Sequence, residues 1–256
     1  MKDKLRVILI GLFSIVLLVS GGFFAYDFLK GEEDNPLLED SPAEIIVPEE
    51  EKEEVELEPD SRDYVKISPD VNLAQKRYEY NNQNIIGRLE IPELFNVLVV
   101  KGKDNGYYLN HSIYNTNDAR GTEFMDYRVN PDSKQINIYG HNSRNKNLKI
   151  PFLKLEKFLD EAFFNANPYI IFQHDNGRSV YKITAIKEVT TYEHMVVEHT
   201  GSDFINQINW FKTDAIHVRE VQFDEDSDII VLQTCSHNLE DAYYIIVGIK
   251  IDYRTE

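Results

Sequence analysis

Short apolar runs alternate with polar breaks along the chain from about residue 65 to the C-terminus. The runs are rich in β-branched and aromatic residues and are bounded by Gly, Asn, Asp and Pro, a pattern that predicts strands. The triplet Asp175-Asn176-Gly177 between two runs predicts a tight hairpin turn. We therefore expect a mainly β barrel or sandwich, with strands at Ile85–Ile91, Val97–Val100, Gln135–Tyr139, Tyr169–Gln173, Val180–Val189, Ile229–Gln233 and Tyr244–Ile251.

Three segments break this pattern with helical spacing. Ser68-Pro69-Asp70 provides an N-cap, a proline at the first helical position and an acid in the first turn, which predicts a helix to about Tyr80. The other two segments place apolar residues three and four apart on one face. They are Pro151–Leu159, with Phe152, Leu155 and Leu159 aligned, and Asp203–Phe211, with Phe204, Ile208 and Phe211 aligned.

The N-terminus differs from the rest of the chain. Residues 7–26 form twenty residues without a charge, a length that matches the hydrocarbon core of a bilayer. Basic residues precede this run and acidic residues follow it, so residues 1–6 are expected in the cytoplasm and everything beyond Lys30 outside the cell. A cleaved signal peptide is the alternative, but its apolar region would be shorter and would end in a small-residue site. The sequence thus predicts a single-pass protein of the cell membrane.

Charge separates a linker from a folded domain. The net charge is −17, and residues 31–63 hold fifteen acids against Lys52 and Arg62. A segment of this composition cannot bury enough apolar surface to fold, so residues 27–64 are interpreted as an extended acidic linker and residues 65–256 as the folded domain. The acidic balance also argues against a nucleic-acid partner, because phosphate binding needs a cationic face.

Cys235 is the one cysteine of the chain, so it cannot form an intramolecular disulfide. It ends the apolar run DIIVLQTC and is followed by polar residues, which places it at a strand end, where a rigid sheet can present a reactive side chain. Burial as a small hydrophobe and a dimer contact are the other possibilities. A nucleophilic cysteine needs a proton-transfer partner, usually histidine.

His141 is the best candidate among the seven histidines. It also follows an apolar run, INIYGHN, and Gly140 before it permits a tight turn. His237 is a weaker candidate, because a residue two positions from Cys235 in an extended chain points the same way but lies in a loop. The others, His111, His174, His194, His199 and His217, lie in polar turns, strand edges or helix flanks, where a surface histidine is expected.

These segments together resemble a sortase, more closely of class B than of class A. The resemblance rests on INIYGHNSRN followed by PFLKLEKF, on VLQTCSHN, and on the upstream GRLEIPELFNVLVVKGKDNGYYL and GTEFMDYR. It covers about residues 70–256. It implies an eight-stranded β-barrel with N-terminal helices and a helix in the connection before the cysteine strand, for which Asp203–Phe211 is the candidate.

The resemblance also implies a chemistry and partners. Sortases cleave a C-terminal sorting signal of LPXTG or NPXTG type between Thr and Gly, keep the acyl part on a cysteine as a thioester, and pass it to an amine. The partners implied are surface proteins or pilins that carry a sorting signal and a peptidoglycan precursor or pilin amine, with no cofactor. Cys235 would be the nucleophile and His141 the proton shuttle.

One family feature is missing. Sortases carry an arginine at the start of the last strand, whereas this chain has LEDAYYIIVGIK there, with Tyr243 or Tyr244 in the arginine's place. Strand alternation lets only one of them face the site, and we expect Tyr243. A tyrosine donates a neutral hydrogen bond, which is weaker than a charge-assisted one, so Arg219 is considered as a substitute. A catalytically impaired binding module and an L,D-transpeptidase remain as alternatives; the motif Gln233-Thr234-Cys235-Ser236 does not match the latter family.

Overall fold

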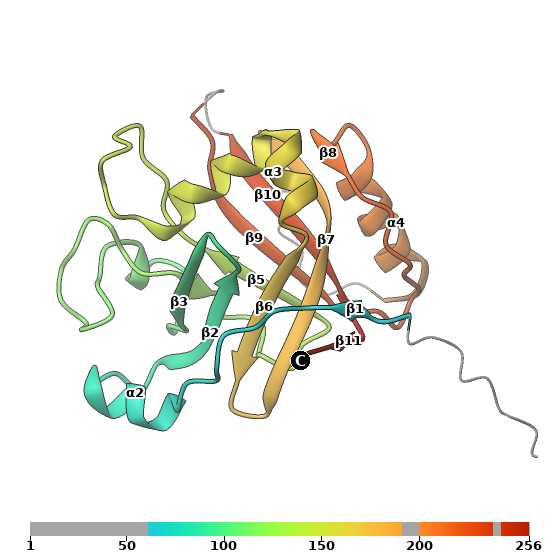
Figure 1. The fold of residues 1–256 in the computed structure, drawn as a ribbon. Helices are drawn as coiled ribbons and strands as arrows, with labels where there is room; N and C mark the ends of the chain where they lie inside the picture. Colours follow the sequence, from blue (N-terminus) through green and yellow to red (C-terminus); the bar gives the residue numbers. More distant parts are fainter. Residues whose placement is uncertain (1–60, 191–199, 238–241, 256) are drawn as a thin grey trace, which may run out of the picture. The chain divides into compact units, whose positions relative to one another are not determined.

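The computed structural model describes residues 61–190, 200–237 and 242–255, all within one compact unit, Pro59–Glu256. A closed, eight-stranded β-barrel forms its centre, as the mainly β pattern predicts (Figure 1). The hydrogen-bonded circuit runs β10-β9-β5-β4-β3-β2-β6-β7 and closes where β7 pairs with β10. The strands are β2 (Ile85–Ile91), β3 (Phe95–Val100), β4 (Phe124–Met125), β5 (Gln135–Tyr139), β6 (Tyr169–His174), β7 (Gly177–Val189), β9 (Ile229–Cys235) and β10 (Tyr243–Ile251).

All seven predicted strands are present, six of them within two residues of the expected ends and the seventh, β7, starting three residues earlier than expected, at Gly177. The hairpin is also confirmed: His174 pairs with Gly177 across a two-residue loop. Gly177 has a positive φ of 139°, a conformation that glycine adopts without strain. The sequence missed only the two-residue β4 and the short strands outside the barrel, which lack enough residues to show a period.

Strands β9 and β10 are apolar on both faces because two cores meet there. Ile230, Leu232 and Ile246 belong to the core inside the barrel. Their neighbours Val231 and Ile245 face outward and pack with α4 (Gly201–Lys212), which lies along β7 in Figure 1. Alternate side chains of one strand therefore stabilise two layers, and the strand end that carries Cys235 is held from both sides.

The predicted helices are found, with two corrections. Helix α2 (Leu73–Glu79) begins at an Asn72 N-cap rather than at Ser68. The reason is tertiary: the Ser68 hydroxyl donates to Glu90 Oε1 at 2.5 Å, and the carbonyls of Ser68 and Pro69 accept from Arg88, which holds this segment against β2. Of the expected N-terminal helices, α2 lies in the described residues.

The second correction concerns Pro151–Leu159, which is a 3₁₀ helix, η2. Its period of three residues buries Phe152, Leu155 and Phe158, whereas Leu159, assigned to that face from an α-helical period, is only partly buried. Helix α4, in the connection before the cysteine strand, confirms its prediction and buries Phe204, Ile208 and Phe211.

Short elements complete the fold. Strands β1 (Asp63–Tyr64) and β11 (Tyr253–Arg254) pair in parallel, so regular structure begins two residues inside the predicted linker. Strand β8 (His217–Val218) pairs with β7 at the outer edge of the sheet. The 3₁₀ helix η1 (Tyr107–Leu109) and α3 (Glu161–Ala166) are the other short elements, and Asp160 caps α3 through Phe163 N.

The predicted location as a single-pass membrane protein is corrected by the structure. The longest helix that it describes, α4, has 12 residues, and a bilayer needs about 20. Across the three described ranges no helix is both long and apolar enough to cross a membrane. The segments on which the prediction rested, residues 1–6, 7–26 and the linker as far as residue 60, lie outside those ranges.

Candidate active site

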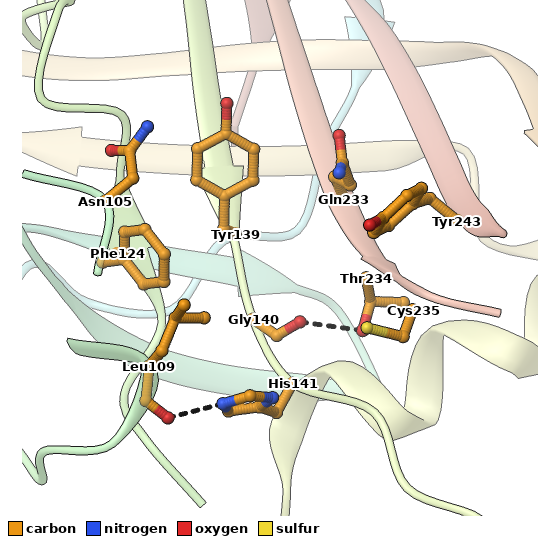
Figure 2. A pocket seen from close by; sticks show the side chains of 10 residues that line it. All are labelled: Asn105, Leu109, Phe124, Tyr139, Gly140, His141, Gln233, Thr234, Cys235 and Tyr243. Carbon is orange, nitrogen blue, oxygen red and sulfur yellow. Dashed lines mark hydrogen bonds between the residues drawn. The ribbon is translucent and has the colours of Figure 1, made fainter. Parts of the chain in front are cut away.

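A cavity of about 360 Å³ lies at one end of the barrel, where β5 and β9 finish. These strands are parallel, with Tyr139 opposite Gln233, so their carboxyl ends meet at the same edge. Cys235 is the last residue of β9, and His141 follows β5 by two residues. Figure 2 shows both side chains among the residues that line the cavity, which are Asn105, Leu109, Phe124, Tyr139, Gly140, His141, Gln233, Thr234, Cys235 and Tyr243.

The Cys235 thiol is half-buried in this largely apolar cavity. Burial raises its pKa above the usual value, because removing water disfavours the thiolate. At neutral pH the thiol of the free protein therefore keeps its proton, and attack on a carbonyl requires a base that takes that proton as the reaction begins.

The His141 ring is held by the backbone of a distant loop. Its Nε2 lies 2.5 Å from the carbonyl oxygen of Leu109, as the dashed line in Figure 2 shows. A carbonyl can only accept, so Nε2 carries the hydrogen and Nδ1 is the nitrogen available for proton exchange in the neutral ring. A backbone carbonyl thus sets the tautomer and orientation of the imidazole, the task that an acidic side chain performs in many Cys–His and Ser–His sites.

Gly121 packs behind this imidazole. A Cβ at Gly121 would lie 3.0 Å from His141 Cδ2 and 2.5 Å from the Tyr108 carbonyl oxygen, and its φ is +62°. Any side chain here would push against the ring or strain the backbone. The loop carrying Leu109 therefore approaches His141 only because position 121 is a glycine.

Hydrogen bonds continue the β5–β9 pairing past the last ladder residues. Gly140 N donates to Gln233 O at 3.2 Å, and Thr234 Oγ1 donates to Gly140 O at 2.8 Å (Figure 2). One step further, Asn142 Nδ2 donates to the Cys235 carbonyl at 2.8 Å. The backbones of the two candidate residues are therefore tied together at the mouth of the cavity.

Tyr243 lies beside Cys235, on the side of the strand that the sequence analysis expects for it. The two residues are direct partners in the antiparallel β9–β10 pairing, and both line the cavity. Tyr244 pairs with Thr234 instead and is buried away from the cavity. Figure 2 shows the Tyr243 ring on the same side as Cys235 and Gln233.

Arg219, considered as a substitute cation, is engaged elsewhere. Its guanidinium donates to the carbonyls of Ile183 and Phe164, at 2.7 and 2.6 Å, and stacks over the Phe164 ring. It does not line the cavity. Its role is to join β7 to α3, so the substitution considered from the sequence is not realised.

The structure also separates His141 from the other described histidines. His237 does not line the cavity, and among the described residues its Nε2 is buried without a hydrogen-bond partner. His111 stacks on Tyr107, and His217 contacts the Leu159 carbonyl. His174 stacks on Phe172, while His194 and His199 lie outside the described residues.

A charged network lies behind two residues of the cavity lining, Tyr139 and Asn105. The Tyr139 hydroxyl and Asn105 Nδ2 both donate to Asp126 Oδ2, at 2.8 and 2.9 Å, and Arg128 forms an ion pair with the same carboxylate. Burial alone would raise the pKa of Asp126, but the bonds from Arg128, Tyr139 and Asn105 outweigh it and lower the pKa to about 2. Asp126 is thus a permanently charged anchor for Tyr139 and for the loop that carries Asn105.

Sequence reasoning missed most of this lining. Leu109, Asn105 and Phe124 lie in the upstream segments that carry the sortase resemblance, but nothing in their local pattern assigns them to the site. Asn142 is part of the YGHN motif, so its neighbourhood to His141 was a usable signal. In the part of the chain that the structure describes, no group of three or more His, Cys, Asp or Glu could hold a metal ion.

The Sortase domain model matches residues 89–249, which span every strand of the barrel except part of β2 and the end of β10. The chain belongs to the sortase family. A sortase B from Listeria monocytogenes is 30% identical over 161 residues, or 60% of this chain and 63% of that protein. A sortase B from Staphylococcus aureus is 25% identical over 169 residues, or 63% of this chain and 66% of that protein.

The fold is shared with a solved sortase structure. The sortase B structure from Clostridium perfringens aligns with a TM-score of 0.64 at 24% identity and covers 70% of this chain and all of that one. The two sequence relatives place this sortase with class B. Membership of the sortase family sets aside the L,D-transpeptidase alternative. The chain spans just under two thirds of the length of the two relatives named above, so their activities come to it only as proposals.

Proposed function

We propose that this sortase is a cysteine transpeptidase that cleaves a C-terminal sorting signal of LPXTG or NPXTG type and joins the released carboxyl end to an amine. The observation that carries the proposal is the meeting of Cys235, His141 and Tyr243 in one cavity, from three separate segments of the chain. Its largely apolar lining suits an extended peptide with apolar side chains. The amine would belong to a peptidoglycan precursor or a pilin.

In the proposed first half-reaction, the Cys235 thiol gives its proton to His141 Nδ1 as the sulfur attacks the threonine carbonyl carbon. The C–S bond forms, and a tetrahedral oxyanion develops. When the C–N bond to glycine breaks, the imidazolium donates its proton to the departing amine. A thioester and a neutral His141 remain. The Leu109 carbonyl favours this cycle because it accepts from Nε2–H throughout and is well placed to stabilise the imidazolium.

The second half-reaction reverses these roles. The incoming amine attacks the thioester carbon, His141 Nδ1 accepts the proton that the amine loses, and the C–S bond breaks to give an amide. The proton then returns to the sulfur, so the thiol is regenerated. Water could replace the amine, and the product would then be a free acid.

Oxyanion stabilisation is where this sortase departs from its family. With no arginine beside Cys235, the proposed donor is the Tyr243 hydroxyl, whose backbone position is fixed by the pairing with Cys235. A neutral donor stabilises an oxyanion less than a guanidinium does, so slow acylation is expected.

The test is incubation of the purified protein with LPXTG-, NPXTN- and SPXTG-type peptides, with and without oligoglycine or a diaminopimelate-containing amine. Mass spectrometry should detect an acyl-enzyme, with the mass of the peptide fragment up to Thr, and an amide product. Absence of any acyl-enzyme under single-turnover conditions would contradict the proposal. It would favour the second candidate, a sortase-like binding module, which the missing arginine and the raised thiol pKa support; binding of an uncleaved peptide would then be the positive sign.

A further inference from the structure

We infer that Asn142 is a positioning residue, whose side-chain amide holds the segment that carries His141 against the backbone of Cys235. The inference rests on the proposed function for its catalytic meaning, but its geometry stands by itself. Asn142 is buried, with 8% of its surface exposed. It follows His141 directly, does not itself line the cavity, and contacts Cys235 through the backbone carbonyl.

Every polar atom of the Asn142 amide has a partner. Nδ2 donates to the Cys235 carbonyl and to Glu156 Oε1, both at 2.8 Å, and Oδ1 accepts from Ser143 N at 2.7 Å. Both partners of Nδ2 are oxygens that only accept, so the orientation of the amide is unambiguous. No other common side chain of this size supplies two donors and an acceptor in this plane.

The bond from Asn142 to the Cys235 carbonyl lies just beyond the end of the β5–β9 pairing. Strands β5 and β9 pair in register as far as Tyr139 and Gln233. Beyond them the chain leaves β5, and the Gly140, Thr234 and Asn142 bonds join the two segments. The Asn142 bond is the outermost of the three and spans 93 residues of sequence. It therefore controls the separation of the two residues that must exchange a proton.

Glu156 accepts the second hydrogen bond from Asn142 Nδ2. It lies on η2 and pairs with Lys146 at 2.5 Å, so the loop after His141 and the 3₁₀ helix are joined through the same carboxylate. A carboxylate acceptor makes a charge-assisted bond to the amide, which is stronger than a neutral one. Glu156 is consequently the support that keeps the Asn142 side chain turned toward Cys235.

Loss of the Asn142 amide should disturb the relative placement of Cys235 and His141, while peptide binding should change little. Because small displacements of reacting groups cost roughly 10²-fold in rate, Asn142→Ala should reduce the acylation rate constant about 10- to 100-fold while leaving KM within about threefold. Glu156→Gln keeps an acceptor for Asn142 and should cost less than threefold, whereas Glu156→Ala should cost about tenfold. Asn145→Ala is the matched control, because Asn145 lies in the same loop and makes only local turn contacts.

The measurement is single-turnover acylation of the full chain by a peptide that the wild-type protein accepts, with circular dichroism to verify folding. A second arm needs no peptide: the rate of iodoacetamide alkylation of Cys235 against pH, which is unambiguous because the chain has one cysteine. In this arm Asn142→Ala and Glu156→Ala should deviate from wild type in the same direction as His141→Ala, and Asn145→Ala should not.

The two arms separate this inference from the proposed function. A wild-type protein that no peptide acylates would overturn the proposed function and leave the alkylation arm to decide the inference. Wild-type acylation and alkylation in folded Asn142→Ala would overturn the inference, as would a rise in KM without a fall in rate. If Asn142→Ala fails to fold, the contrast between Glu156→Gln and Glu156→Ala decides it by the same criteria.

Discussion

The two ionisable groups Asp126 and Cys235, on different sides of the cavity, have pKa values shifted in opposite directions. The buried Asp126 carboxylate receives bonds from Tyr139, Asn105 and Arg128, and its pKa falls to about 2. At Cys235, burial raises the pKa of the thiol and keeps it protonated. The Asp126 carboxylate has its partners before any ligand arrives. The Cys235 thiol would need a proton acceptor and an oxyanion donor during the reaction, and His141 and Tyr243 are the proposed ones.

This difference teaches how to separate structural from reactive groups in such a cavity. A titratable group with a complete set of partners is held in one protonation state across the physiological range and serves as an anchor. A desolvated group whose charged form lacks support changes state only when a neighbour takes part, which is a property of reactive sites. Four predictions test whether the Asp126 group is structural and the Cys235 group reactive.

The largest effect is expected for Cys235→Ala. This variant should lose cleavage and acyl-enzyme formation entirely, because the chain holds one thiol, while the barrel should remain folded because the residue is only half-buried. Peptide cleavage and intact mass are the measurements. Turnover equal to wild type would remove Cys235 from the chemistry and overturn the transpeptidase proposal.

The next effect concerns the proton shuttle. His141→Ala should slow acylation on the order of 10²-fold or more, since a positioned acid–base group contributes that much. His237→Ala should cost far less, because His237 does not line the cavity. Single-turnover rates of the two variants should be compared directly, and the reverse order would show that the imidazoles have been assigned to the wrong roles.

Substitutions of Tyr243 test the proposed oxyanion donor beside Cys235. Tyr243→Phe should slow acylation by roughly tenfold, the loss expected for one or two kcal/mol of hydrogen bonding, and Tyr243→Arg should raise it by supplying a charged donor. Phenylalanine preserves the packing of β10 against Cys235, so the comparison isolates the hydroxyl. Wild-type acylation by Tyr243→Phe would assign the oxyanion donor to backbone N–H groups.

The smallest catalytic effect is expected for Asp126→Asn, which should reduce acylation by less than about threefold but lower the melting temperature at pH 7 by roughly 3–10 °C, since it weakens bonds to a buried charge. The folded pKa of about 2 lies below the unfolded value of about 3.9. The stabilisation is therefore present above about pH 4 and is lost as the pH falls toward 2. Melting curves from pH 7 to pH 2.5 should show the two proteins converging; a constant difference would mean that the carboxylate charge does not carry the effect.

Local patterns in the sequence determined the strands, the α4 helix and the placement of Cys235 and His141 at strand ends. Strand periodicity, the Asp175-Asn176-Gly177 turn and the placement of Cys235 and His141 at strand ends depend on neighbouring residues, which a sequence displays directly. That Tyr243 rather than Tyr244 lines the cavity was also expected from strand alternation, which has a period of two.

Only the tertiary structure decided how the helices begin and which groups complete the site. Ser68 has the local features of an N-cap, yet Glu90, 22 residues away, takes its hydroxyl, and the packing of η2 on the barrel imposes a period of three on a segment whose pattern allowed 3.6. His141 is oriented by the Leu109 carbonyl, and Cys235 by the Asn142 amide, across 32 and 93 residues. Barrel closure sets such contacts, and because backbone carbonyls are common to all residues, no residue type in the sequence marks which carbonyl will be used.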